Sequence, residues 1–241
     1  MNNEAMATAL QRAAHIFAQR LDAVSAGLDA VAERSQSILA CPSGERPSRA
    51  DLQALRDPVA KLIAESQQLV DGAGIAVGSG ILADADSWLQ WWRPQRDGRL
   101  EFTAHRFNPL SLNYYDYQAM NWFRIPVEAG EASVVGPYVD TGGTDLRIVT
   151  VTVPFAVGDG PRSVAAADLS LDCLERVLLR SLGTRDRDVV LLTDSGKIVA
   201  SNTARHVTGT ILDSGSVREE ETLPILSARP ARIPWRLALI I

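Results

Sequence analysis

The chain has few of the residues that most often carry covalent or metal chemistry. It contains two cysteines, Cys41 and Cys173, in 241 residues. Because they lie far apart, we expect buried free thiols, with a single disulfide as the alternative. The three histidines, His15, His105 and His206, are scattered without metal-ligand spacing. We expect His15 in a helix and the other two at the surface.

The sequence also lacks the motifs of the common enzyme classes. It has no GxSxG elbow, no phosphate-binding Walker loop and no GxGxxG that opens a helix after a strand. The segment 141–144 (TGGT) predicts the closure of a hairpin, with an anion-binding backbone nest as the alternative. Two acids in a pocket can serve as acid and base, but no nucleophile or metal accompanies them here. We therefore expect no catalytic activity, no metal and no cofactor.

Excess positive charge and long apolar runs are absent as well. The net charge of −5 argues against nucleic acid and against an anionic membrane surface as partners. No run approaches the roughly 18 apolar residues of a membrane-spanning helix, and the charged N-terminus does not have the pattern of a secretory signal. We expect a soluble, cytoplasmic protein, with an excised ectodomain as the alternative because the sequence ends on the apolar LALII.

Residues 8–40 predict one long helix with a hydrophobic seam. The seam residues recur at alternating steps of four and three: Leu10, Ala14, Phe17, Leu21, Val24, Leu28 and Val31. Such a heptad pattern favours packing against another long helix. We therefore predict a homodimer formed through this helix.

The rest of the chain predicts an α+β fold with antiparallel sheets. Ser48 and Asp51 resemble a capping box that begins a second helix, which runs to about Val70 and which Pro58 interrupts or divides. Trp88, Trp91 and Trp92 are assigned to helix-on-sheet packing. Further strands, hairpins and one helix follow from periodicity and turn residues: 73–83, 99–105, 132–138, 146–155, 163–169, helix 170–182, 188–202 and 233–241.

Five residues of the central region form the candidate site: Tyr115, Trp122, Tyr138, Asp140 and Asp168. Carboxylates accept charge-assisted hydrogen bonds from an ammonium group, and aromatic faces attract the same cation. If these side chains converge, they would bind a small amine. Asp140 also fits an ordinary turn residue, and Asp168 also fits the cap of the next helix. Asp168 follows a strand that looks buried, so its carboxyl group must be paired, hydrogen-bonded or protonated.

The order of these segments resembles the double Cache family of sensor domains. The likeness rests on the long N-terminal helix, the segment ADLSLDCL, the hairpin VVLLTDSGKIVASN and the closing strand PWRLAL. It implies a long N-terminal helix followed by two PAS-like (Cache) modules. The implied division is a helical region at 1–70, a membrane-distal-like module with the ligand pocket at 71–169, and a linking helix with a smaller second module at 170–241.

The resemblance extends to the ligand motif of the amino-acid-binding members. The motif is matched in order by Tyr115, Trp122, Tyr138, Asp140 and Asp168. Met120 stands where the family has arginine. Methionine cannot form the bidentate contact that arginine offers a carboxylate. The resemblance therefore implies an amine-binding type of sensor domain.

Two alternatives stay open at this stage. Arg124, which would share a strand face with Trp122, or Arg147 could anchor a carboxylate or amino acid. The chain could instead be a structural dimerisation protein with a degenerate pocket. In any sensor, the output would pass to an effector protein that the sequence does not identify.

Overall fold

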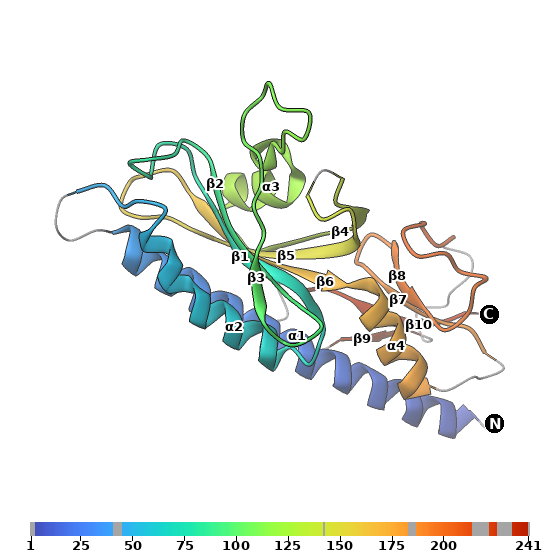
Figure 1. Ribbon diagram of the computed structural model, residues 1–241. Coiled ribbons are helices and arrows are strands. Elements are labelled where there is room, and N and C mark those ends of the chain that lie inside the picture. The colour runs from blue at the N-terminus through green and yellow to red at the C-terminus, as the bar shows by residue number, and fades with distance from the viewer. Residues whose placement is uncertain are drawn as a thin grey trace.

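The computed structural model describes residues 3–40, 45–141, 143–182, 187–213, 222–225 and 233–240. A 37-residue helix, α1 (Asn3–Leu39), lies along one face of a six-stranded sheet, and the shorter helix α2 (Arg56–Glu65) lies beside it. A further helix, α3 (Asn121–Ala129), covers the opposite face (Figure 1). A four-stranded sheet and helix α4 (Leu171–Leu182) lie near the N-terminal half of α1. This arrangement confirms the predicted α+β class.

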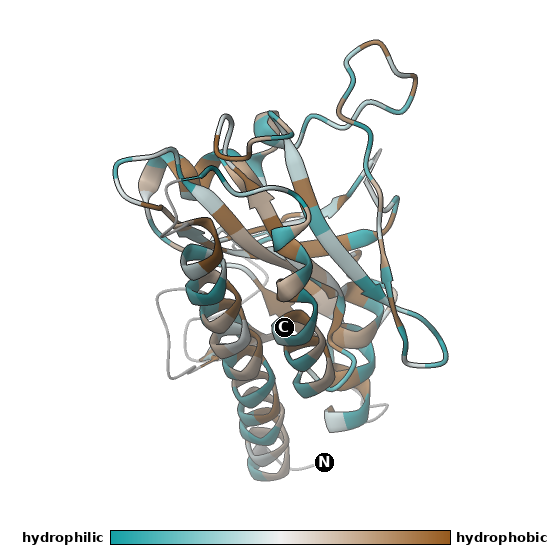
Figure 2. Ribbon diagram, turned by 60° about the vertical axis from the view of Figure 1, so that its left-hand side comes forward, coloured by the Kyte–Doolittle hydropathy of each residue, from teal (hydrophilic) through white to brown (hydrophobic). Residues whose placement is uncertain are grey.

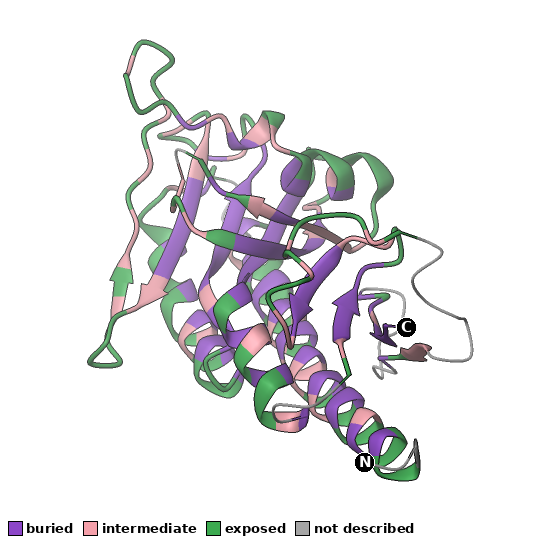
Figure 3. Ribbon diagram, turned by 90° about the vertical axis from the view of Figure 1, so that its right-hand side faces the viewer, coloured by how far each residue is buried: buried purple, intermediate pink, exposed green. Residues whose placement is uncertain are grey.

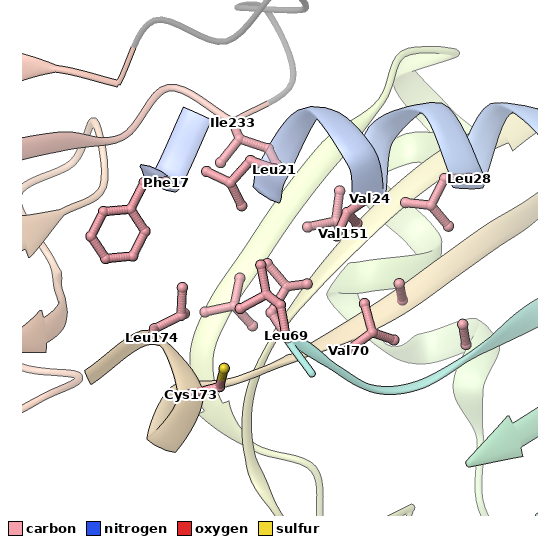
Figure 4. Packing of buried hydrophobic residues seen from close by; sticks show 14 of the residues in the cluster. Phe17, Leu21, Val24, Leu28, Leu69, Val70, Val151, Cys173, Leu174 and Ile233 are labelled. Carbon is pink, nitrogen blue, oxygen red and sulfur yellow. The ribbon is translucent and has the colours of Figure 1, made fainter. Parts of the chain in front are cut away.

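The hydrophobic seam of α1 is covered within the chain itself. Phe17, Leu21, Val24 and Leu28 are fully buried, and α1 contacts α2, α4 and the strands β5 and β6 described below. Figure 4 shows these side chains facing Leu69, Leu174 and Val151. The predicted long helix is confirmed, but the seam already has its partner inside the fold. A second copy of the chain would have to contact another surface.

The second helical region consists of two consecutive helices, which is one of the two outcomes that the sequence predicted. A short 3₁₀ helix, η1 (Asp51–Leu55), leads directly into α2. The carboxylate of Asp51 accepts hydrogen bonds from the Ser48 backbone N–H and hydroxyl group at 2.8 and 2.7 Å. Pro58 lies in the first turn of α2, where its missing N–H costs no helical hydrogen bond. The helix ends at Glu65, before the predicted end near Val70.

The larger sheet is antiparallel throughout and has the strand order β3-β2-β1-β6-β5-β4. Its strands are β1 (Val70–Val77), β2 (Trp88–Pro94), β3 (Leu100–Phe102), β4 (Ser133–Val139), β5 (Arg147–Phe155) and β6 (Ser163–Ser170). Glycine at position 98, with φ of 82°, allows the β2–β3 hairpin turn. Every residue of β6 is buried, because this central strand is covered on both faces (Figure 3).

The smaller sheet has the order β8-β7-β10-β9. Its strands are β7 (Val189–Leu192), β8 (Ile198–Ser201), β9 (Thr222–Pro224) and β10 (Arg236–Leu239). The first two form the predicted hairpin, whose turn contains Gly196 at a φ of 79°. Strand β9 was not predicted; three residues give too short a pattern to detect alternation.

One sequence interpretation is wrong in the aromatic segment. Residues 121–129 form the helix α3 rather than an extended segment. Trp122 and Phe123 are buried residues of this helix, and Gly130 ends it in the left-handed conformation. On a helix, residues two apart point in different directions, so Arg124 does not share a face with Trp122.

Hydrophobic side chains are distributed as the layers require. Figure 2 shows brown, hydrophobic stretches on the strands and an alternation of brown and teal along α1. Cys173 is buried with a free thiol, as predicted, whereas Cys41 lies outside the described residues. None of the helices in the described ranges combines the length and the apolar character that crossing a bilayer requires.

Candidate functional site

A small cavity lies between the larger sheet and the segments that include α3. It contains about 270 Å³ of space between atoms, part of it continuous with solvent. All five residues singled out in the sequence line it. The complete lining is Leu89, Trp91, His105, Tyr115, Trp122, Tyr138, Asp140, Thr144, Thr150 and Asp168.

Asp168 forms the floor of this cavity. It lies on the central strand β6, directly opposite Thr150 on β5 and Gly72 on β1. The side chain is 6% exposed and accepts a hydrogen bond from Thr150 Oγ1 at 2.8 Å. Burial, together with the negative charge of Asp140, raises the pKa of the Asp168 carboxyl group to about 8. At neutral pH this carboxyl group is therefore largely protonated unless a cation accompanies it.

The alternative role of Asp168 as a helix cap is not what the structure shows. The cap of α4 is Ser170, whose hydroxyl oxygen accepts a hydrogen bond from the Cys173 N–H at 3.3 Å. Asp168 lies two residues before that cap and lines the cavity instead.

Asp140 lies where β4 ends and is 5% exposed. One carboxylate oxygen accepts a hydrogen bond from the Tyr115 hydroxyl group at 2.8 Å. The other accepts hydrogen bonds from the Thr144 N–H at 2.7 Å and the Thr144 hydroxyl group at 3.0 Å. The backbone carbonyl of Asp140 also accepts the Asp145 N–H at 2.9 Å. Asp140 is thus both a turn residue and a cavity residue, so its two sequence interpretations are compatible.

The aromatic residues form the walls. Tyr138 on β4 donates its hydroxyl proton to Thr150 Oγ1 at 2.6 Å, since the single Thr150 hydroxyl proton is given to Asp168. Trp122 lies in the first turn of α3, 5% exposed. Burial raises the pKa of both the Tyr115 and Tyr138 hydroxyl groups, so these tyrosines are neutral donors at physiological pH.

Five residues of the cavity were not predicted as site residues from the sequence: Leu89, Trp91, His105, Thr144 and Thr150. Trp91 lies on β2 with its ring over Gly72, and a Cβ atom added at that glycine would lie 2.7 Å from Trp91 Nε1. The neighbouring Trp92 packs on the α1 side of the sheet, and Trp91 packs with Trp122 and Phe123 of α3 on the other side, so both take part in helix-on-sheet packing as predicted. Strand alternation could have separated the two, since adjacent residues face opposite sides.

His105 was predicted at the surface, and this is wrong. Its ring is half-buried in the cavity wall and stacks on Tyr115, with ring centroids 5.2 Å apart. Desolvation lowers the pKa of His105 despite the opposing effect of the nearby Asp140 charge. The imidazole therefore stays neutral near pH 7. His206 is also only partly exposed, and its ring Nε2 lies 3.0 Å from an Asp188 carboxylate oxygen.

None of the side chains considered as carboxylate anchors lines the cavity. Arg124 is about half exposed and pairs with Glu128 at 3.0 Å, and Arg147 pairs with Asp172 at 3.5 Å on the surface. Met120 packs at the edge of the aromatic cluster, just before α3 begins. Among the described residues, no lysine or arginine lines the cavity and no group of three His, Cys, Asp or Glu is placed to hold a metal.

The geometry suits a positively charged guest. Two buried carboxyl groups share a cavity in which the other titratable wall residues, among those that the structure describes, are the neutral His105, Tyr115 and Tyr138. A cation entering this cavity would offset the cost of ionising Asp168 and would contact aromatic faces. The buried Trp91 Nε1 and His105 Nδ1 have no hydrogen-bond partner among the described residues, so a guest can also find polar contacts there.

Comparison with known proteins gives one matching family model and many similar structures. The model describes the first PDC sensor domain of methyl-accepting chemotaxis protein-like proteins and matches residues 95–176, a range that includes all five candidate site residues. No curated protein sequence matches the chain.

Among solved structures, a methyl-accepting chemotaxis protein X has a TM-score of 0.62 at 16% identity, covering 94% of this chain and 93% of its own. The ligand-binding domain of the Pseudomonas aeruginosa amino-acid chemoreceptor PctC, in complex with GABA, has a TM-score of 0.61 at 18% identity, covering 99% of both chains. The ligand-binding domain of PctB from the same organism, in complex with L-arginine, has a TM-score of 0.56 at 16% identity, covering 99% of this chain and 94% of its own. The chain has the fold of these ligand-binding domains.

Proposed function

We propose that this chain is a non-enzymatic, Cache-type sensor domain that binds a small organic amine in the cavity between the larger sheet and α3. The observation that carries the proposal is the pair of buried acids, Asp140 and Asp168, in a cavity that no arginine or lysine lines among the described residues. The family model and the chemoreceptor structures support a sensing role.

In this proposal the two acids have different tasks. Asp168 accepts the ammonium group and becomes ionised as the cation enters, because the cation offsets the burial cost that otherwise keeps it protonated. Asp140 is already held by Tyr115 and Thr144, so it offers a preorganised negative charge. Trp122, Tyr115 and Tyr138 then surround the cation and exclude water.

Thermal shift and calorimetry with primary amines, polyamines and quaternary ammonium compounds test the proposal. A bound amine should raise the melting temperature and give one site per chain. Asp168→Asn should abolish the shift and still fold, whereas Asp159→Asn, at an exposed loop position, is the matched control and should bind normally. Failure of every cation to bind the wild-type chain would refute the proposal.

An amino acid is the second candidate ligand class, and one observation favours it. Trp91 Nε1 is a buried donor without a partner among the described residues, and a carboxylate oxygen of an amino acid would be a suitable acceptor. PctC and PctB, which share the fold, are amino-acid chemoreceptors. Tighter binding of amino acids than of the matching amines without a carboxylate would favour this candidate.

The homodimer, the effector partner and the cytoplasmic location stay proposals. Because the seam of α1 is buried within the chain, we propose that any dimer uses the exposed side of α1. Sedimentation of the protein with and without ligand would measure the association, and fractionation of cells that express the native gene would locate the protein.

A further inference from the structure

A second cavity lies on the other side of the larger sheet, between α1, α4 and the turn that joins α2 to β1. It contains about 480 Å³ of space between atoms, part of it open to solvent. Arg20 of α1 and Arg176 and Arg180 of α4 line it, and no acidic residue does so among the described residues. Because Arg176 and Arg180 are four residues apart on one helix, they lie on the same face and repel each other.

No carboxylate of the described residues lines this cavity, although Arg176 interacts electrostatically with Asp71 and donates a hydrogen bond to the Asp172 carbonyl at 3.2 Å. None of the three arginines forms an ion pair with a carboxylate in the described part of the chain. Arg20 Nε is buried without a hydrogen-bond partner. Its Nη1 has only a long contact to the Gln67 carbonyl at 3.4 Å and one to Cys173 Sγ at 3.9 Å. A buried guanidinium N–H without an acceptor is unusual in folded proteins, because its desolvation is then uncompensated.

The backbone that forms one wall is strained. Gln67 and Gln68 have φ values of 53° and 67°, in the left-handed region that residues other than glycine rarely adopt. The side chain of Gln68 lines the cavity and carries two amide donors. Consecutive residues in this conformation are uncommon outside sites where a ligand or a fixed geometry requires them.

We infer that this cavity binds a small multivalent oxyanion, such as pyrophosphate or a tricarboxylate. Guanidinium groups recognise phosphate and carboxylate oxygens through paired, charge-assisted hydrogen bonds. An oxyanion would supply the acceptor that Arg20 Nε lacks and would relieve the repulsion between Arg176 and Arg180. Ile16 and Val177 add apolar walls that limit the size of the guest.

The inferred anion site is independent of the proposed amine site. The two cavities share no lining residue and lie against different hydrophobic clusters of the fold. The anion cavity touches α4, which begins at Leu171, three residues after Asp168. An anion that joins α1 to α4 would therefore stabilise the docking of these two helices.

Titration calorimetry on the whole chain tests the inference, with sodium pyrophosphate and citrate as probes and sodium chloride at matched ionic strength as the reference. We expect saturable binding of at least one probe at one site per chain. Pyrophosphate alone would identify a phosphate site, and citrate alone a carboxylate site. Arg20→Gln and Arg180→Gln should each weaken binding by about tenfold or more.

Arg34→Gln is the matched control, since Arg34 is exposed on α1, outside the cavity, and carries the same charge. It should leave the affinity within about twofold of wild type. Arg180 is exposed, so its variant keeps the test valid if Arg20→Gln does not fold. Absence of binding by both probes, or equal weakening in Arg34→Gln and Arg180→Gln, would overturn the inference.

Discussion

Thr150 and Asp168 face each other across β5 and β6, and the threonine hydroxyl group donates to the aspartate at 2.8 Å. Tyr138 donates in turn to the same threonine at 2.6 Å. Thr150 therefore connects the wall of the cavity to its floor, and this hydrogen-bonded chain fixes the direction in which the Asp168 carboxyl group points.

Replacing Thr150 by valine should weaken ligand binding by about tenfold while changing the side-chain shape little. The variant leaves the Tyr138 hydroxyl group and the Asp168 carboxyl group without their shared partner, so ionisation of Asp168 becomes less favourable. Calorimetry measures the affinity. Thr152→Val is the control, because Thr152 lies on the same strand and bonds to the Ser133 carbonyl at 3.1 Å. Equal losses in both variants would contradict a specific role for Thr150.

Amine affinity should rise with pH up to about pH 8. Below that value the empty protein holds a proton on Asp168, and a cation must displace it, so the association constant should increase by up to about tenfold per pH unit. Above pH 8 it should level off while a primary amine is still charged. Calorimetry in buffers of different ionisation enthalpy should show release of a proton at pH 7. A pH-independent affinity between about pH 6 and 8 would be evidence against this role of Asp168.

The stability of the ligand-free protein should depend on the same carboxyl group. A folded-state pKa raised from 3.8 to about 8 means that the folded state holds the proton more tightly than the unfolded state. The resulting stabilisation is fully present below about pH 3.8 and is lost as the pH rises through about 8. Asp168→Asn should therefore gain stability relative to wild type between about pH 5 and 9, by at least about 2 °C in melting temperature. Asp159→Asn should show no such trend.

Adding a methyl group at Gly72 should displace Trp91 and disturb the cavity. The new Cβ atom would lie 2.7 Å from Trp91 Nε1, closer than van der Waals contact allows. We expect Gly72→Ala to destabilise the protein by about 1–3 kcal/mol and to weaken ligand binding. Chemical unfolding and calorimetry measure the two effects. In a Trp91→Phe background, whose smaller ring leaves room for the new methyl group, Gly72→Ala should destabilise the protein less. If the two destabilisations simply add in the double variant, the contact between position 72 and Trp91 is not the cause.

Introducing arginine at position 120 should shift the preference from plain amines toward amino acids. Met120 packs at the edge of the aromatic cluster, and arginine there would bring a bidentate partner for a carboxylate close to the cavity. Competition between an amino acid and the amine that lacks its carboxylate measures the shift. Met120→Lys adds charge without the planar fork and should shift the preference less. An unchanged ratio would mean that position 120 does not face the ligand.

Much of the fold could be predicted because its patterns are long. The helix at 8–40 and the strands at 132–138, 146–155 and 163–169 carry enough periodic residues to define their type. Helix α3 could not be recognised: it has nine residues, contains Pro126 and lacks a polar N-cap side chain. The heptad seam predicted helix packing but not the identity of the partner, which is the chain itself.

The candidate site was predicted in part. The five residues of the motif do reach one cavity, although their binding of a ligand stays a prediction. Thr144 and Thr150 carry no signal in the sequence, because threonine is common in strands and turns for reasons of packing and local hydrogen bonding. The role of Thr150 follows from the register of β5 and β6, which places it opposite Asp168, and the role of Thr144 follows from the turn that brings it to Asp140.

The two acids of the cavity are held by backbones of very different stiffness. Strand β6 is hydrogen-bonded along both edges, to β1 and to β5, so Asp168 cannot travel without disrupting the centre of the sheet. Asp140 stands at the start of a turn on the outermost strand of the same sheet. Motion of the turn that begins at Asp140 should therefore control how fast a ligand enters and leaves. Substitutions in that turn should change the residence time of the ligand more than they change the position of Asp168.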